Sequence, residues 1–128
     1  ILDNRTNQFS YARAGHELPI IVTTDGTTRI AHYEQGQLMG VLEDLILDEQ
    51  SVSVPQGGLI LLYTDGVIDA RHINGESFGL ERLLEALKRS KAGSAQQHCD
   101  QLWQTICEFQ SKDSQEDDVT IVALKSNS

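Results

Sequence analysis

The first half of the chain alternates short apolar runs with turn residues, a pattern typical of β-strands rather than helices. Runs at 9–14, 19–24, 27–33 and 46–54 predict four strands. The pair Asp25-Gly26 separates the second run from the third. It predicts a two-residue type I′ hairpin turn, because both central positions of that turn need a positive φ.

The most apolar of the predicted strands covers 59–64, where every residue is apolar or favours β structure. Such a run predicts a strand buried on both faces. Asp65 and Gly66 follow it directly. A carboxylate at the end of a buried strand is costly to desolvate. We therefore expect a cation or a set of backbone N–H donors as its partner.

The second half of the chain has helical periodicity and then returns to a strand. A helix is predicted over 80–90, because its leucines recur at i, i+3, i+4 and i+7. Ser94 and Gln97 fit a capping box that opens a longer helix ending near Gln110. The residues expected on the core face of that helix are Cys99, Leu102, Trp103, Ile106 and Phe109. A last strand is predicted over 119–124, and strands followed by helices indicate an α+β layered fold.

Composition narrows the class of protein. The chain has 128 residues, of which 39% are hydrophobic and 23% charged, as expected for one globular domain. A net charge of -9 without a Lys/Arg cluster argues against binding to nucleic acid or to anionic lipid. No apolar stretch is long enough to span a bilayer, and no signal peptide is visible.

The two cysteines are expected to be reduced. Cys99 and Cys107 lie roughly 12 Å apart along one predicted helix, which is too far for a disulfide. No basic neighbour in the sequence would lower their pKa, so we expect thiols in the core of a cytoplasmic protein.

Besides Asp65, a second acidic segment lies far along the chain, where Asp117 and Asp118 directly precede the last predicted strand. Two strands that end or begin in aspartate can place carboxylates side by side at one end of a sheet. Oxygen ligands suit magnesium, manganese or calcium, so Asp65, Asp117 and Asp118 are candidate metal ligands. Adjacent strand residues face opposite ways, so Asp117 and Asp118 are not expected to point at the same site from one face.

Simpler structural roles remain open for each of these residues. Asp65 can be a turn residue beside Gly66, and the acidic stretch 113–118 can be a solvated loop. His16 is a candidate general acid or ligand, against the alternative of a loop histidine that hydrogen-bonds the backbone. No P-loop, dinucleotide fingerprint or Gly-x-Ser-x-Gly elbow is present.

Four stretches together resemble one family: 11–19 with Ala-Gly-His, 61–70 with Tyr-Thr-Asp-Gly, 76–79, and 117–120 with Asp-Asp-Val-Thr. They occur in the order seen in the bacterial stage II sporulation and stress-response serine phosphatases, which are PPM-type metal-dependent protein phosphatases. The resemblance covers nearly the whole chain. It implies an α-β-β-α sandwich of antiparallel sheets flanked by helices.

The resemblance also implies a metal site and its ligands. Two Mn2+ or Mg2+ ions are expected between the sheets, with Asp65 and Asp117 matching the family's catalytic, metal-binding aspartates. Asp118 is a further metal candidate, although related phosphatases often carry asparagine there. Asp69 stands where the family commonly has glutamate.

One family element has no match in the chain. Nothing in 1–15 resembles the family's amino-terminal Gly-Asp-aromatic-aromatic-Asp stretch, which carries another metal ligand. We therefore expect 1–128 to be the carboxy-terminal part of a single PPM-type phosphatase domain, with an incomplete metal site. A sandwich lacking its amino-terminal portion should expose an apolar sheet face or edge, through which two copies could pair as a homodimer.

For the complete domain, the resemblance implies hydrolysis of phosphoserine or phosphothreonine in a regulatory protein. By family analogy the substrate is a phosphorylated STAS-type anti-sigma-factor antagonist. A second hypothesis is a regulatory or scaffolding domain that binds a partner protein without catalysis. A third is a calcium module using 113–118, although that stretch lacks the glycine and closing glutamate of an EF-hand loop.

Overall fold

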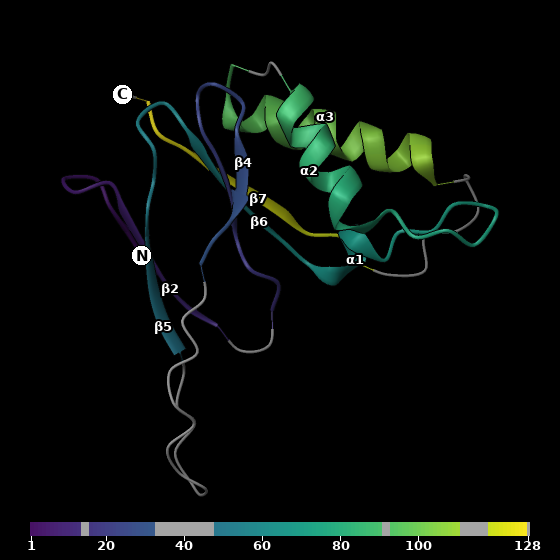
Figure 1. Cartoon of the computed structure of the whole chain (residues 1–128), viewed down its shortest axis with the longest axis horizontal. Coiled ribbons are helices and arrows are strands. Elements are labelled where there is room, and N and C mark those ends of the chain that lie inside the picture. Colours follow the sequence, from purple (N-terminus) through teal and green to yellow (C-terminus); the bar gives the residue numbers. More distant parts are fainter. Residues whose placement is uncertain (14–15, 33–47, 91–92, 111–117, 128) are drawn as a thin grey trace, which may run out of the picture.

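Two antiparallel sheets lie face to face, and helices cover one of them (Figure 1). The computed structural model describes residues 1–13, 16–32, 48–90, 93–110 and 118–127. The smaller sheet has the order β1-β2-β5, formed by β1 (Leu2–Asp3), β2 (Gln8–Arg13) and β5 (Asp48–Ser53).

The larger sheet has the order β4-β3-β6-β7. Its strands are β3 (Ile20–Val22), β4 (Thr28–Ile30), β6 (Leu59–Tyr63) and β7 (Ile121–Lys125). The helices are α1 (Asp65–Ile68), α2 (Gly79–Arg89) and α3 (Ala95–Phe109). Figure 1 shows α2 and α3 on one side of the larger sheet and the strands β2 and β5 on the other.

The central strands β3 and β6 divide the core into two layers. Ile20, Leu59 and Leu61 pack against the helices, whereas Ile21 and Ile60 pack against the smaller sheet. This division follows from the alternation of side chains along a strand. Both faces of β6 are therefore buried, which confirms the prediction made from its unbroken apolar sequence.

The described residues form three layers of the expected sandwich, in the order helices, larger sheet, smaller sheet. This confirms the predicted α+β class and the face-to-face antiparallel sheets. Among the described residues, no helix covers the outer face of the smaller sheet. None of the helices within the described residues combines the length and the hydropathy that a transmembrane span requires.

The outer face of the smaller sheet is polar, so the expected apolar exposure does not occur on this face. The Gln8 amide donates to Ser53 Oγ at 2.7 Å, and Ser51 Oγ donates to Gln8 Oε1 at 3.2 Å. Exposed apolar side chains lie on edge strands, with Ile30 on β4 and Val122 on β7, as the alternative of an exposed apolar edge predicted.

The predicted type I′ turn at Asp25-Gly26 is wrong. Thr23 N donates to Thr27 O at 2.9 Å and Gly26 N donates to Thr23 O at 3.0 Å, which encloses a three-residue loop. Gly26 has φ 82°, whereas Asp25 is not among the described residues with positive φ. A three-residue loop with glycine in its last position needs only one left-handed residue.

The core face of α3 is rotated from the predicted one. His98, Leu102 and Ile106 are buried, and Trp103 is 41% exposed. Residues four apart share a face, whereas Trp103 is turned about 100° from Leu102. His98 is accommodated because Ser90 Oγ donates to Gln101 Oε1 and can therefore accept from His98 Nδ1, at 2.9 Å.

The capping box predicted at the start of α3 is present. Ser94 Oγ accepts from Gln97 N at 3.2 Å, and Gln97 Oε1 accepts from Ser94 N at 3.0 Å. The same Gln97 oxygen also accepts from Gly93 N at 2.9 Å. These bonds satisfy donors that the first turn of a helix leaves without a partner.

Replacing Ser94 with alanine should lower the free energy of unfolding by about 1 kcal/mol, because the first turn of α3 loses its side-chain acceptor. Chemical denaturation of Ser94→Ala, Gln97→Ala and the double variant measures this effect. The double variant should lose less than the sum of the single losses, since the two side chains act on one turn. Strict additivity would contradict the reciprocal box.

Candidate active site

Strands β6 and β7 bring the two acidic segments of the sequence together. Their antiparallel register pairs Tyr63 with Ile121 at the end of the ladder. Beyond it, Thr64 N donates to Thr120 O at 3.1 Å, and Thr120 N donates to Thr64 Oγ1 at 3.0 Å. The backbone contact thus continues to Thr64, which precedes Asp65, and to Thr120, which lies two residues after Asp118.

Gly66 lies directly against the backbone of Asp118. A Cβ atom at Gly66 would stand 2.3 Å from Asp118 O, which is closer than real Cβ atoms approach. The glycine of the Asp-Gly pair is therefore required for close backbone approach, and not for an unusual φ. Thr64 Oγ1 also lies 3.4 Å from Asp118 O.

Asp65 is the first residue of the short helix α1, and its side chain is exposed. Within the described residues, its carboxylate has no hydrogen bond or ion pair. Its backbone oxygen accepts from Asp69 N at 2.8 Å, which closes α1. Water solvates this exposed carboxylate, so the expected cost of desolvation is absent, and its oxygens are accessible to a ligand.

The candidate ligands lie on two segments that touch. Asp65 belongs to one segment and Asp118 to the other, and Asp69 comes one helical turn after Asp65. Asp117 precedes Asp118 in the sequence and lies outside the described residues. Within the described ranges, no group of three or more His, Cys, Asp or Glu side chains is arranged to hold a metal ion.

A cavity of about 330 Å³ opens between the two sheets beside the same strand end. It is lined by both Thr64 and Thr120 and by His16 and Glu17, which come from the loop after β2. The Ala-Gly-His segment and the Thr-Asp-Gly segment therefore border one hollow, although they lie far apart in the sequence. Arg13 Nε donates to His16 O and fixes the start of that loop.

Tyr11 and Tyr63 line the cavity, and both belong to stretches that carry the family resemblance, although neither was assigned a role in the site. Burial, and then the negative charge of Glu17, raise the pKa of Tyr63 from 10.0 to about 12. Burial also raises the pKa of Tyr11, against the opposing charge of Arg13. The Tyr11 hydroxyl is buried and has no hydrogen-bond partner in the described part of the chain.

Thr64 is the functional residue that the sequence prediction missed. Its hydroxyl accepts from Thr120 N and so joins the two acidic segments. Its place in the Tyr-Thr-Asp-Gly motif and between a buried strand and an Asp-Gly pair are the sequence signals for such a role.

Comparison with solved structures identifies the class of this fold. The chain superimposes on the manganese-presoaked phosphatase domain of the cell fate determinant SpoIIE from Bacillus subtilis, with a TM-score of 0.77 and 17% identity. The match covers 98% of this chain and 53% of that one. At this identity the likeness shows the fold alone, which is that of a PP2C-type phosphatase domain.

The sequence places the chain in a family. The model of the Stage II sporulation protein E (SpoIIE) family matches residues 1–127, so the chain belongs to that family. It is 30% identical to Protein IcfG of Synechocystis over 99% of this chain and 20% of that protein. It is 29% identical to the phosphoserine phosphatase RsbU of Bacillus subtilis over 93% of this chain. The chain spans about a third of RsbU, since the match covers 35% of its length.

Replacing Gly66 with alanine should displace the Asp118 backbone, because no space exists for the added carbon. We expect a loss of about 1–3 kcal/mol in the free energy of unfolding, together with weaker Mn2+ binding in titration calorimetry. Gly93→Ala is the matched control. Its added carbon would lie 3.3 Å from Gln97 Oε1, the far end of a flexible side chain. Equal, small losses in both variants would contradict the close approach.

Alkaline titration should detect Tyr63 as a late-ionising tyrosine. The folded protein holds its phenol neutral, so the corresponding stability is present below pH 10 and is lost as the pH rises toward about 12. In the ultraviolet absorbance of tyrosinate, Tyr63→Phe should remove the highest-pH transition. Glu17→Gln should shift that transition to lower pH, and Glu49→Gln should leave it in place. A transition that survives Tyr63→Phe would show the assignment to be wrong.

Proposed function

We propose that this chain is part of a Mn2+- or Mg2+-dependent phosphatase domain that hydrolyses phosphoserine or phosphothreonine in a regulatory protein. The supporting observation is the direct contact between the segments 64–66 and 118–120. In that contact the segment with the exposed Asp65 carboxylate meets Asp118, which follows Asp117 in the sequence and precedes β7. Membership of the SpoIIE family and similarity to the phosphoserine phosphatase RsbU support the same activity.

In this proposal Asp65 and Asp117 are the catalytic metal ligands, and Asp118 is a third candidate. Two divalent cations, when bound, supply Lewis-acid activation of water and neutralise charge on the phosphoryl group. The protein's own contribution is to fix the carboxylates. Thr64 holds the two segments together, and Gly66 allows them to approach.

We propose a phosphorylated STAS-type anti-sigma-factor antagonist as the substrate, acted on in the cytoplasm. The similarity to RsbU supports this choice of pathway. Both cysteines are free thiols, with Cys99 half-buried and Cys107 exposed, so the expectation of two core thiols is wrong for Cys107. Residues 1–128 would form part of one phosphatase domain, and catalysis would belong to the intact polypeptide that contains them.

The test is manganese-dependent release of phosphate from a serine-phosphorylated STAS protein by that intact polypeptide. Asp65→Asn should lower kcat/KM about a hundredfold or more, because it removes a charged metal ligand while keeping the shape of the side chain. Asp100→Asn changes an exposed aspartate on α3 and should leave the rate within about twofold.

Two outcomes would overturn the proposal. An intact polypeptide that binds the phosphorylated protein without releasing phosphate would be a scaffold, as the second hypothesis holds. A rate that depends on manganese but is unchanged by Asp65→Asn would remove Asp65 from the site.

A further inference from the structure

A short hairpin, residues 71–77, comes directly after α1. Arg71 and Ser77 form its β-bridge, and His72 N donates to Glu76 O at 2.8 Å. Its turn closes where Gly75, with φ 85°, donates to His72 O at 2.8 Å. The Asn74 side chain accepts from Glu76 N at 3.0 Å and braces the turn from within.

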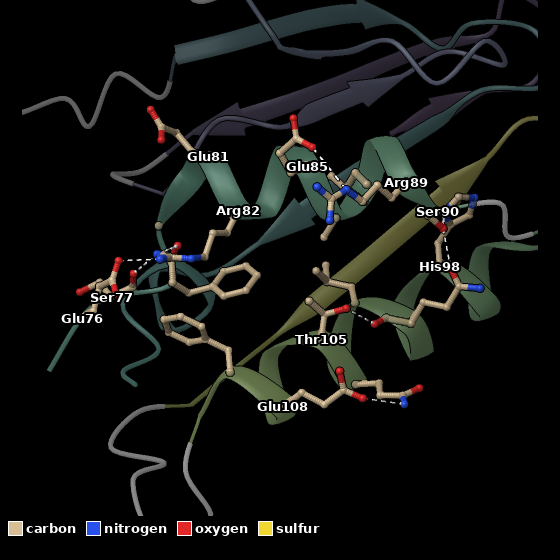
Figure 2. Close-up of a pocket in the computed structure, with 18 residues that line it drawn as sticks. Glu76, Ser77, Glu81, Arg82, Glu85, Arg89, Ser90, His98, Thr105 and Glu108 are labelled. Atoms are coloured by element: carbon tan, nitrogen blue, oxygen red, sulfur yellow. Dashed lines mark hydrogen bonds and ion pairs between the residues drawn. The ribbon is translucent and has the colours of Figure 1, made fainter. Parts of the chain in front are cut away.

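Arg82 of α2 holds the base of this hairpin. Its guanidinium donates to Ser77 O at 2.9 Å and to Phe78 O at 3.1 Å, and it pairs with Glu76 at 2.5 Å (Figure 2). The same group lies 4.8 Å from the centre of the Phe109 ring of α3. One arginine therefore fixes the hairpin against both long helices.

The hairpin is also tied to the candidate active site. Phe78 N donates to Ala70 O at 2.7 Å, and Ala70 lies just after the end of α1. Phe78 is only 2% exposed and packs edge-on against Phe109, with ring centres 5.3 Å apart. The helix that begins with Asp65 and the hairpin after it are thus anchored to the same core.

The tip of this anchored hairpin carries an apolar side chain that contributes nothing to the core. Ile73 is 78% exposed; among the large apolar side chains of the described residues, only Ile1, at 92%, is more exposed. Its backbone is already ordered by the hairpin, so little conformational entropy remains to be lost if the side chain is buried against a partner. A convex, pre-ordered apolar tip fits a depression on a protein surface, not a small molecule.

We propose that hairpin 71–77 docks the protein substrate, with Ile73 entering an apolar depression beside the phosphorylated residue. This inference rests on the proposed phosphatase function. The chain carries a net charge of -9 and its substrate a phosphate, so long-range electrostatics oppose their encounter. Burial of an apolar side chain is a source of affinity that this repulsion does not remove.

The experiment compares two substrates of the intact Mn2+-loaded polypeptide: a serine-phosphorylated STAS protein and p-nitrophenyl phosphate. Ile73→Ala should raise KM for the phosphoprotein roughly tenfold, and Ile73→Glu should raise it further. Hydrolysis of p-nitrophenyl phosphate should stay within about twofold in both variants, because that compound is too small to reach the hairpin. Leu2→Ala is the matched control for both substrates, because Leu2 is an exposed apolar residue on β1 of the smaller sheet, outside the hairpin.

Binding of the phosphoprotein to the Asp65→Asn polypeptide, measured by calorimetry, gives a second readout that needs no turnover. Adding Ile73→Ala to it should weaken binding about tenfold, while adding Leu2→Ala should not. Unchanged phosphoprotein KM and binding in Ile73→Ala would overturn the docking role, as would an equal loss on both substrates. If the unmodified polypeptide hydrolyses neither substrate, the proposed function fails, and the binding comparison still decides the role of Ile73.

Discussion

The candidate site depends on one backbone contact, between the end of β6 and the start of β7. Thr64 and Thr120 exchange hydrogen bonds beyond the last paired residues, and Gly66 lets the Asp118 backbone approach without a Cβ in the way. Thr64 and Asp118 are separated by 54 positions in the sequence, yet the two acidic segments meet at one sheet end. Without this contact, Asp65 would be an ordinary exposed turn residue.

The rest of the fold makes that contact rigid. β6 lies between β3 and β7 and is buried on both faces, so its end cannot shift without disturbing two core layers. The segment that follows α1 packs against the layer formed by α2 and α3. Arg82 and Phe78 anchor the segment after α1, and the hairpin carrying Ile73 projects from this fixed base. A rigid platform that bears an exposed carboxylate and an exposed apolar tip suits recognition of a folded protein.

Periodic patterns predicted the elements well, because burial repeats along them. The apolar run before Asp65 predicted β6, and the leucine stripe predicted α2. Features that depend on the conformation of one residue, or on one side-chain contact, were less predictable from the sequence. The turn at Asp25-Gly26 uses one left-handed residue instead of two, and His98 replaces Trp103 on the buried face because Ser90 supplies a partner. The Asp-Gly pair suggested a special position, but only tertiary structure shows that Gly66 touches Asp118 and that the Thr64 hydroxyl joins the strands.

The most direct measurement is anomalous diffraction from crystals of the intact polypeptide soaked in Mn2+. The account predicts a manganese peak within coordination distance of the Asp65 carboxylate, at the sheet end where β6 meets the segment leading into β7. A peak bound only elsewhere, with the Asp65 carboxylate turned to solvent or paired with a protein cation, would contradict it.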